Sequence, residues 1–83
     1  MYTVYVTNSI DQRAITEPAC IEQRLEFANM EDARAFMTTT MRLDPHFQPR
    51  CIRCLEYAEN LVAVDFGSWS RFIFLQGDGA LNW

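Results

Sequence analysis

The sequence predicts a single α+β domain in which one helix packs on an antiparallel sheet. Its 83 residues suffice for one hydrophobic core but not for two. Hydrophobic residues make up 49% of the chain and charged residues 22%, a composition typical of globular proteins and too apolar for disorder. Segments with strand-type alternation lie on both sides of one segment with helical spacing. We therefore expect the element order β-β-α-β-β-β.

Two strands are expected before the helix. Residues 2–7 alternate β-branched and aromatic side chains, a pattern typical of a strand. Turn-forming residues follow, and the second strand is expected within residues 19–27, after Pro18. We expect Ile21, Leu25 and Phe27 to share its buried face and Glu22, Arg24 and Glu26 its solvated face.

The helix is the clearest element of the sequence. Asn29 is the expected N-cap, and Glu31 and Asp32 fall in the first turn, where the helix dipole favours anions. Asp44 and Pro45 end the helix. The residues expected on its apolar face are Ala33, Phe36, Met37, Thr40 and Met41.

Three strands are expected after the helix, at residues 50–57, 61–66 and 71–76, joined by two hairpin turns. The last two are apolar on both faces, whereas one helix covers only one face of a sheet. We expect an apolar patch on the second face, drawn from Leu61, Ile73, Leu75 and their neighbours, that serves a partner or self-association. A curled sheet or a covering loop is the alternative.

The charges exclude several functions. The chain has eleven acidic residues, seven arginines and no lysine, which gives a net charge of −4. Without lysine there is no Schiff-base amine and no P-loop lysine. A negative protein repels phosphate backbones, so we expect no direct nucleic-acid binding, with a local arginine patch as the alternative. A basic protein groove is the better electrostatic partner. No apolar run approaches the ~20 residues of a membrane span.

All the cysteines and the only histidine together provide enough ligands for structural zinc. Two of them stand three apart at the start of an expected strand, where they would point to opposite faces, and no glycine supports a zinc turn. Buried free thiols are the alternative, and a redox pair would need a helix start. We assign no metal and no cofactor to Cys20, His46, Cys51 and Cys54.

Catalysis is not expected. His46 is the only possible histidine base, and Ser68 and Ser70 lie far from it along the chain without a nucleophile elbow. The letters D-F-G at residues 65–67 lack every other kinase motif. Of the eleven aromatic residues, most are expected in the core, and Trp69 in a turn and Trp83 are the two least easily assigned to it. Exposed tryptophan is enriched at binding hot spots, although each could pack on its own domain.

The layout, with the segment V-A-V-D-F-G-S-W-S-R-F-I-F at Val62 to Phe74, resembles the small acidic accessory proteins of bacteriophages, including anti-CRISPR inhibitors. This resemblance implies stoichiometric binding of a host protein in the bacterial cytoplasm, with an acidic surface that occupies a nucleic-acid groove. It assigns no role to any residue.

The sequence thus favours a non-enzymatic, protein-binding inhibitor with an acidic surface. An assembly protein that is stable as a homodimer through an uncovered sheet face is the alternative, and a zinc-stabilised domain is a third. The expected partner-binding residues are the acids Glu17, Glu22, Glu26, Glu31 and Asp32, with Phe47 or Trp69 as apolar anchor.

Overall fold

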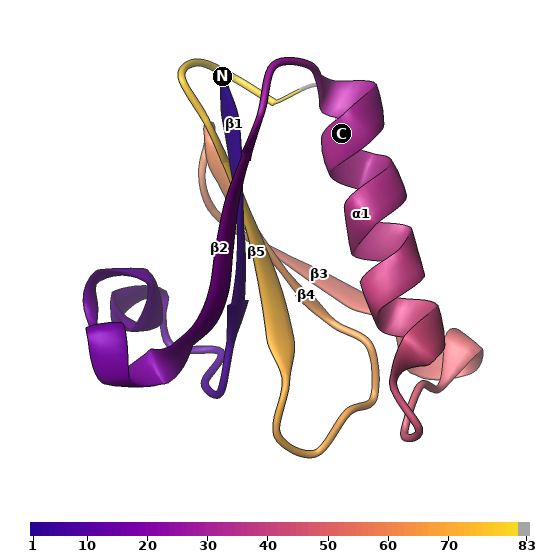
Figure 1. Ribbon diagram of the computed structural model, residues 1–83. Coiled ribbons are helices and arrows are strands. Elements are labelled where there is room, and N and C mark those ends of the chain that lie inside the picture. The colour runs from indigo at the N-terminus through magenta and orange to yellow at the C-terminus, as the bar shows by residue number, and fades with distance from the viewer. Residues whose placement is uncertain (82–83) are drawn as a thin grey trace.

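The computed structural model describes residues 1–81 and shows one helix packed on a five-stranded antiparallel sheet (Figure 1). The α+β prediction is confirmed, and three short 3-10 helices add to the expected order. The elements are β1 (Tyr2–Thr7), η1 (Gln12–Thr16), η2 (Pro18–Cys20), β2 (Ile21–Phe27), α1 (Met30–Leu43), η3 (Pro49–Cys51), β3 (Arg53–Ala58), β4 (Leu61–Asp65) and β5 (Phe72–Gly77).

The sheet has the strand order β2-β1-β5-β4-β3, and each neighbouring pair is antiparallel. Its middle strand is therefore β5, between β1 and β4, so the first and last strands of the described chain lie side by side. Val4 of β1 lies opposite Leu25 of β2 on one side and Leu75 of β5 on the other. The outer strands are β2 and β3, and each has one edge without a strand partner among the described residues.

Helix α1 forms as the sequence predicts. The side chain of Asn29 accepts a hydrogen bond from the backbone N–H of Asp32 at 2.9 Å, which satisfies a donor that the first turn leaves free. Ala33 and Met37 are buried against the sheet. Poor helix formers at 38–40 are tolerated because this apolar face packs on β1 and β2. Among residues 1–81, no helix has the length and apolar character needed to cross a membrane.

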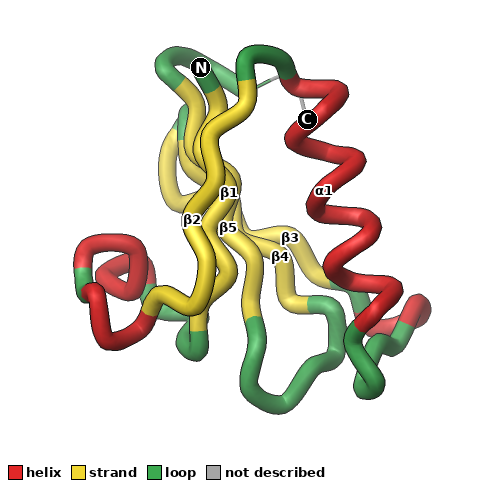
Figure 2. Tube along the Cα trace, viewed as in Figure 1, coloured by secondary structure: helices red, strands yellow, loops and turns green. Residues whose placement is uncertain are grey.

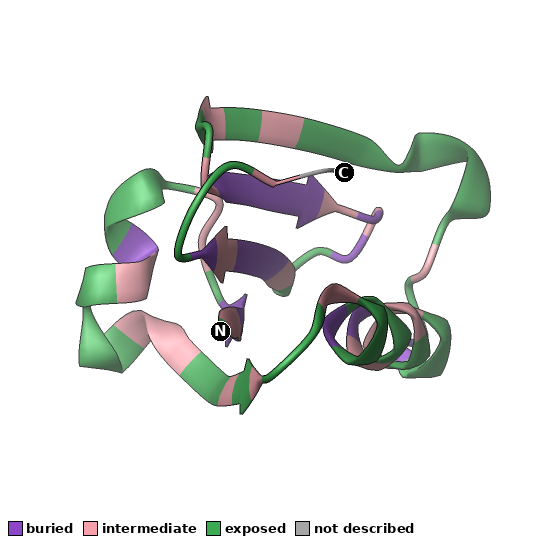
Figure 3. Ribbon diagram, turned by 90° about the horizontal axis from the view of Figure 1, so that it is seen from above, coloured by how far each residue is buried: buried purple, intermediate pink, exposed green. Residues whose placement is uncertain are grey.

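Both faces of the sheet are covered, by different parts of the chain (Figure 3). On one face, Val62 and Val64 of β4 and Ile73 and Leu75 of β5 form a cluster with residues of α1. On the other, a second cluster forms beneath the segment 8–20 with its 3-10 helices. The members of this second cluster are Tyr5, Ala14, Leu61, Ala63 and Phe74, with Ile10, Ile15, Cys20, Ile21, Leu55, Tyr57 and Phe72 at its margin.

The predicted exposed patch on the second face is therefore wrong. Ile73 and Leu75 are fully buried on the helix side, and Leu61 is buried in the second cluster. The covering-loop alternative describes the structure, because segment 8–20 folds over this face and buries Ala14. Figure 2 shows its two short helical turns standing apart from α1, across the sheet.

A bulge in β2 overturns the predicted division of that strand into two faces. Val6 lies opposite Gln23, but the next residue, Thr7, lies opposite Ile21, so Glu22 is an extra residue in the ladder. Ile21 consequently packs in the second cluster, whereas Phe27 packs in the first. The extra residue reverses the alternation because strand side chains repeat every two residues.

The first strand after the helix begins later than predicted. Pro49 opens η3, so Cys51 lies in a 3-10 helix, and β3 starts at Arg53. The predicted turn at residues 58–60 is a hairpin, but Asn60 does not use the left-handed conformation that it tolerates. Trp83 lies outside the described residues.

Candidate interaction surfaces

Carboxylates gather at one end of the fold. Phe27, Tyr2 and Gly77 lie side by side across three strands, and the backbone N–H of Gly77 donates to the carbonyl of Asn60 at 2.9 Å. The end of β2, the start of α1, the end of β5 and the β3–β4 turn therefore meet, at the top of Figure 1. We call this region the acidic end; its carboxylates are Glu26, Glu31, Asp32, Glu56, Glu59 and Asp78.

Only part of this negative charge is compensated. Arg24 pairs with Glu26 at 3.1 Å, and the amine of Met1 pairs with Asp78 at 2.8 Å. Both pairs are exposed, so dissolved salt screens their attraction and they stabilise the fold little. Within residues 1–81, no ion pair involves the remaining four carboxylates of the acidic end.

The predicted acids are only partly brought together. Glu26, Glu31 and Asp32 share the acidic end, whereas Glu17 lies at the junction of η1 and η2. Glu22 lies at the β2 bulge, near the other end of the sheet. Its carboxylate contacts the guanidinium of Arg71 at 3.2 Å, and the two residues line a hollow with Val6 and Thr40. The expected common face of Glu22, Arg24 and Glu26 is therefore wrong.

The two proposed anchors differ in exposure. Trp69 is 83% exposed, and its ring stacks on His46 with centroids 4.6 Å apart and planes 12° apart. Phe47 is half-buried, lies 6.4 Å from the ring of Phe66 and packs against the helix-side core. Trp69 remains a candidate anchor, whereas Phe47 is partly buried against the helix-side core. Trp69 lies at the end of the sheet opposite the acidic end, so the two do not form one surface.

Asp44 organises the loops around Trp69, a role that the sequence analysis missed. Its side chain is only 4% exposed, accepts hydrogen bonds from the backbone N–H of His46 at 2.8 Å and the hydroxyl of Ser68 at 3.1 Å, and lies 3.9 Å from Arg71. The only local signal was an aspartate at the end of a helix, which indicated a stop. Its partner Ser68 is 24 residues further along the chain.

A second carboxylate ties the start of β3 to the end of β4. Arg53 donates to Asp65 at 2.7 Å and thereby lowers the pKa of that carboxyl below its usual value; the backbone N–H of Gly67 at 3.1 Å acts in the same direction. On the covering segment, the side chain of Arg13 lowers the pKa of Asp11 to about 2. Both carboxylates are held in their charged form.

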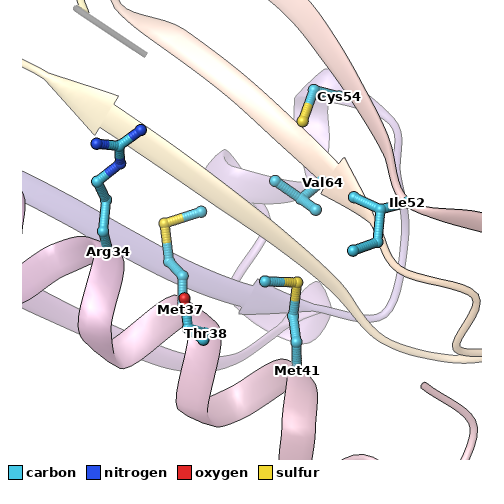
Figure 4. Close-up of a pocket in the computed structure, with 7 residues that line it drawn as sticks. All are labelled: Arg34, Met37, Thr38, Met41, Ile52, Cys54 and Val64. Carbon is cyan, nitrogen blue, oxygen red and sulfur yellow. The ribbon is translucent and has the colours of Figure 1, made fainter. Parts of the chain in front are cut away.

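A small groove of about 200 Å³ lies between α1 and β3 (Figure 4). Apolar side chains and one thiol make up most of its wall, and the groove is about large enough for one apolar side chain. Helix α1 packs on the β1–β2 half of the sheet, which leaves this space above β3 and β4. The lining residues are Arg34, Met37, Thr38, Met41, Ile52, Cys54 and Val64.

The candidate zinc ligands lie apart. Cys20 borders the second cluster, and His46 stacks on Trp69 at the end of the sheet. Cys51 lies in η3, and Cys54 lies in β3 beside the groove. No group of three potential metal-ligating side chains occurs in the described part of the chain.

The fold and its surfaces define a small α+β domain with a two-sided core, an acidic end and an opposite end that displays a stacked tryptophan. No family model, no characterised protein sequence and no solved structure matches the chain.

Proposed function

We propose that this protein is a non-enzymatic, protein-binding domain whose acidic end docks on a basic groove of its partner. The separation of charge along the fold supports this proposal. Six of the eleven acidic residues lie at the acidic end. Four of the seven arginines, Arg42, Arg50, Arg53 and Arg71, lie toward the opposite end, where Glu22, Asp44 and Asp65 are paired with Arg71 and Arg53. A net charge of −4 thus becomes a concentrated negative field at one end of the molecule.

Such a field suits a partner that normally holds nucleic acid. A groove lined with basic residues attracts carboxylates as it attracts phosphates, and charge complementarity speeds association and makes it sensitive to salt. The narrower proposal is a phage-encoded inhibitor that occupies the nucleic-acid groove of a host protein in the bacterial cytoplasm. It follows from the resemblance in layout, and the acidic end is its contact surface.

The structure of residues 1–81 lacks the open sheet face on which the homodimer alternative was based. Segment 8–20 covers that face with Ala14 buried at its centre. No described apolar face of comparable extent takes its place. We therefore do not propose a sheet-face dimer.

The test compares two variants of equal net charge. Replacing Glu31 and Glu59 by glutamine changes the charge from −4 to −2 at the acidic end, and Glu17→Arg makes the same change outside it. All three side chains are exposed, and none has an ion pair in the structure as described. Each immobilised variant and the parent would be exposed to bacterial lysate at low and high salt, and retained proteins would be quantified by mass spectrometry.

We expect the parent and Glu17→Arg to retain the same basic protein at low salt, and the acidic-end variant to retain at least about tenfold less. High salt should release it from both. Equal loss in the two variants would show that net charge alone controls retention and would refute a specific acidic end. A partner that all three baits retain equally would refute the proposal as well.

A further inference from the structure

Trp69 and His46 form a rigid aromatic surface that the acidic end does not use. The indole is 83% exposed although the imidazole of His46 covers one of its faces at a centroid distance of 4.6 Å. The two rings come from different loops, one after α1 and one between β4 and β5. We call this surface the Trp69 platform; it consists of Trp69 and His46.

The loops that carry the platform are fixed to each other at three points. The carboxylate of Asp44 accepts from Ser68 at 3.1 Å and from the backbone N–H of His46 at 2.8 Å. The backbone N–H of Gln48 donates to the carbonyl of Phe66 at 3.0 Å. Stacking of the two rings adds the third contact. These contacts hold Trp69 in its exposed position. Because the side chain is already fixed, it loses little conformational entropy when it binds a partner.

Unlike most carboxylates of the acidic end, those near the platform, Glu22, Asp44 and Asp65, are already paired with arginines. Arg42 lies in the last turn of α1 and Arg50 in η3, on either side of the loop that carries His46. Both are exposed, and neither has an ion pair within the residues that the structure describes. Arg71 is already engaged by Glu22 and Asp44. Two arginines therefore remain for a negatively charged partner.

We propose that the Trp69 platform binds an acidic segment of a partner protein. An apolar side chain of that segment packs on the open face of the indole, and its carboxylates meet the guanidinium groups of Arg42 and Arg50. Tryptophan and arginine are the residues most enriched at binding hot spots, and arginine binds carboxylates through paired hydrogen bonds. Single-stranded nucleic acid would also stack on an indole, but it carries one negative charge per nucleotide, and only Arg42 and Arg50 remain here to neutralise phosphates, which favours a short acidic segment.

This inference does not depend on the proposed function. The acidic end would recognise a basic partner, whereas the platform recognises an acidic one, and the two surfaces lie at opposite ends of the sheet. A protein with both would bridge two partners. The variants that test one surface leave the other intact, so either proposal can fail alone.

The experiment is a titration followed by NMR. The 15N-labelled protein receives a pool of short peptides, each with one leucine, proline or tryptophan flanked by aspartate and glutamate. The same pool with asparagine and glutamine in place of the acids tests charge, and a short oligothymidylate tests nucleic acid. The variants are Trp69→Ala, Arg50→Gln and, as a control of equal charge change, Arg13→Gln, whose arginine pairs with Asp11 on the covering segment.

We expect saturable shifts of the Trp69 indole and of residues 42–50 and 67–71 with the acidic pool. Trp69→Ala should weaken binding at least tenfold, and Arg50→Gln should weaken it severalfold while Arg13→Gln does not. An unchanged spectrum, equal binding of the amide pool, or unchanged affinity of Trp69→Ala would each overturn the inference. Tighter binding of oligothymidylate than of the acidic pool would assign the platform to nucleic acid instead. Because Trp69 is exposed, its replacement should leave the fold intact, which the dispersion of the same spectra checks.

Discussion

The substitution Asp44→Ala tests whether one buried carboxylate joins the two loops at the end of the sheet. It removes the acceptor of two hydrogen bonds, from the backbone N–H of His46 at 2.8 Å and from the hydroxyl of Ser68 at 3.1 Å. Ser68 is itself buried, so its hydroxyl would be left without this partner.

The expected loss follows from these contacts. A hydrogen bond to a charged group contributes about 1.5–3 kcal/mol, and a buried polar group left unsatisfied costs about 1–3 kcal/mol. Because one carboxylate accepts both hydrogen bonds, their contributions are not independent and should not be added in full. We therefore expect Asp44→Ala to lower the free energy of unfolding by about 3 kcal/mol. In a domain of this size that corresponds to a Tm about 15–20 °C lower. Asp44→Asn keeps one acceptor oxygen and should lose about half as much.

The assay is thermal and urea unfolding followed by circular dichroism, with Glu59→Ala as the control because that carboxylate is exposed and has no hydrogen bond in the described structure. The control should stay within about 0.5 kcal/mol of the parent. The double variant with Ser68→Ala should show a coupling of at least about 0.5 kcal/mol. If Asp44→Ala unfolds like Glu59→Ala, or shows no coupling with Ser68→Ala, Asp44 does not join the loops.

Two further predictions concern the same end of the sheet. Gly67→Ala should destabilise the protein by about 1–3 kcal/mol, because φ of Gly67 is +88° and the new Cβ would lie 2.6 Å from Cβ of Gln48. In the control Gly79→Ala the new Cβ meets no atom within 4 Å, so this variant should be neutral or slightly stabilised. Equal urea midpoints for the two variants would contradict this prediction. Arg53 lowers the pKa of Asp65 in the folded state, so the contribution of this carboxylate is complete above its usual pKa of about 4 and is lost as the pH falls through the lowered folded value. Asp65→Asn should therefore be less stable than the parent at pH 7 and approach it as the pH falls below the lowered folded pKa, and a stability difference that persists at low pH would argue against the ion pair.

The helix and the central strands could be predicted because their signals are local. Asn29 caps the helix as expected, and β1 coincides with the alternating segment 2–7. The covered second face was harder to predict. Segment 8–20 contains turn formers, and its apolar residues Ile10, Ala14 and Ile15 follow no strand alternation, so only the sheet beneath them reveals their role.

Two features of the candidate surfaces depended on long-range contacts. Glu22 was assigned to the charged face of β2 because alternation assumes an unbroken ladder, and a bulge is defined only by the partner strand. Asp44 gave only a helix-stop signal, since Ser68 and Arg71 reach it through tertiary structure. Trp69 was correctly singled out as hard to place in the core, but its distance from the acidic end was not predictable from composition.

The bulge in β2 also affects how the protein behaves at high concentration. A sheet edge with free N–H and C=O groups is a template for pairing with another chain, and a bulge bends the strand and interrupts the flat ladder that such pairing needs. The opposite edge strand, β3, has a register shift of its own between Glu56 and Ala58. Both borders of the sheet are thus irregular, and β2 adds exposed charges along its length. The sheet therefore carries its own protection against growth into fibrils by edge-to-edge addition.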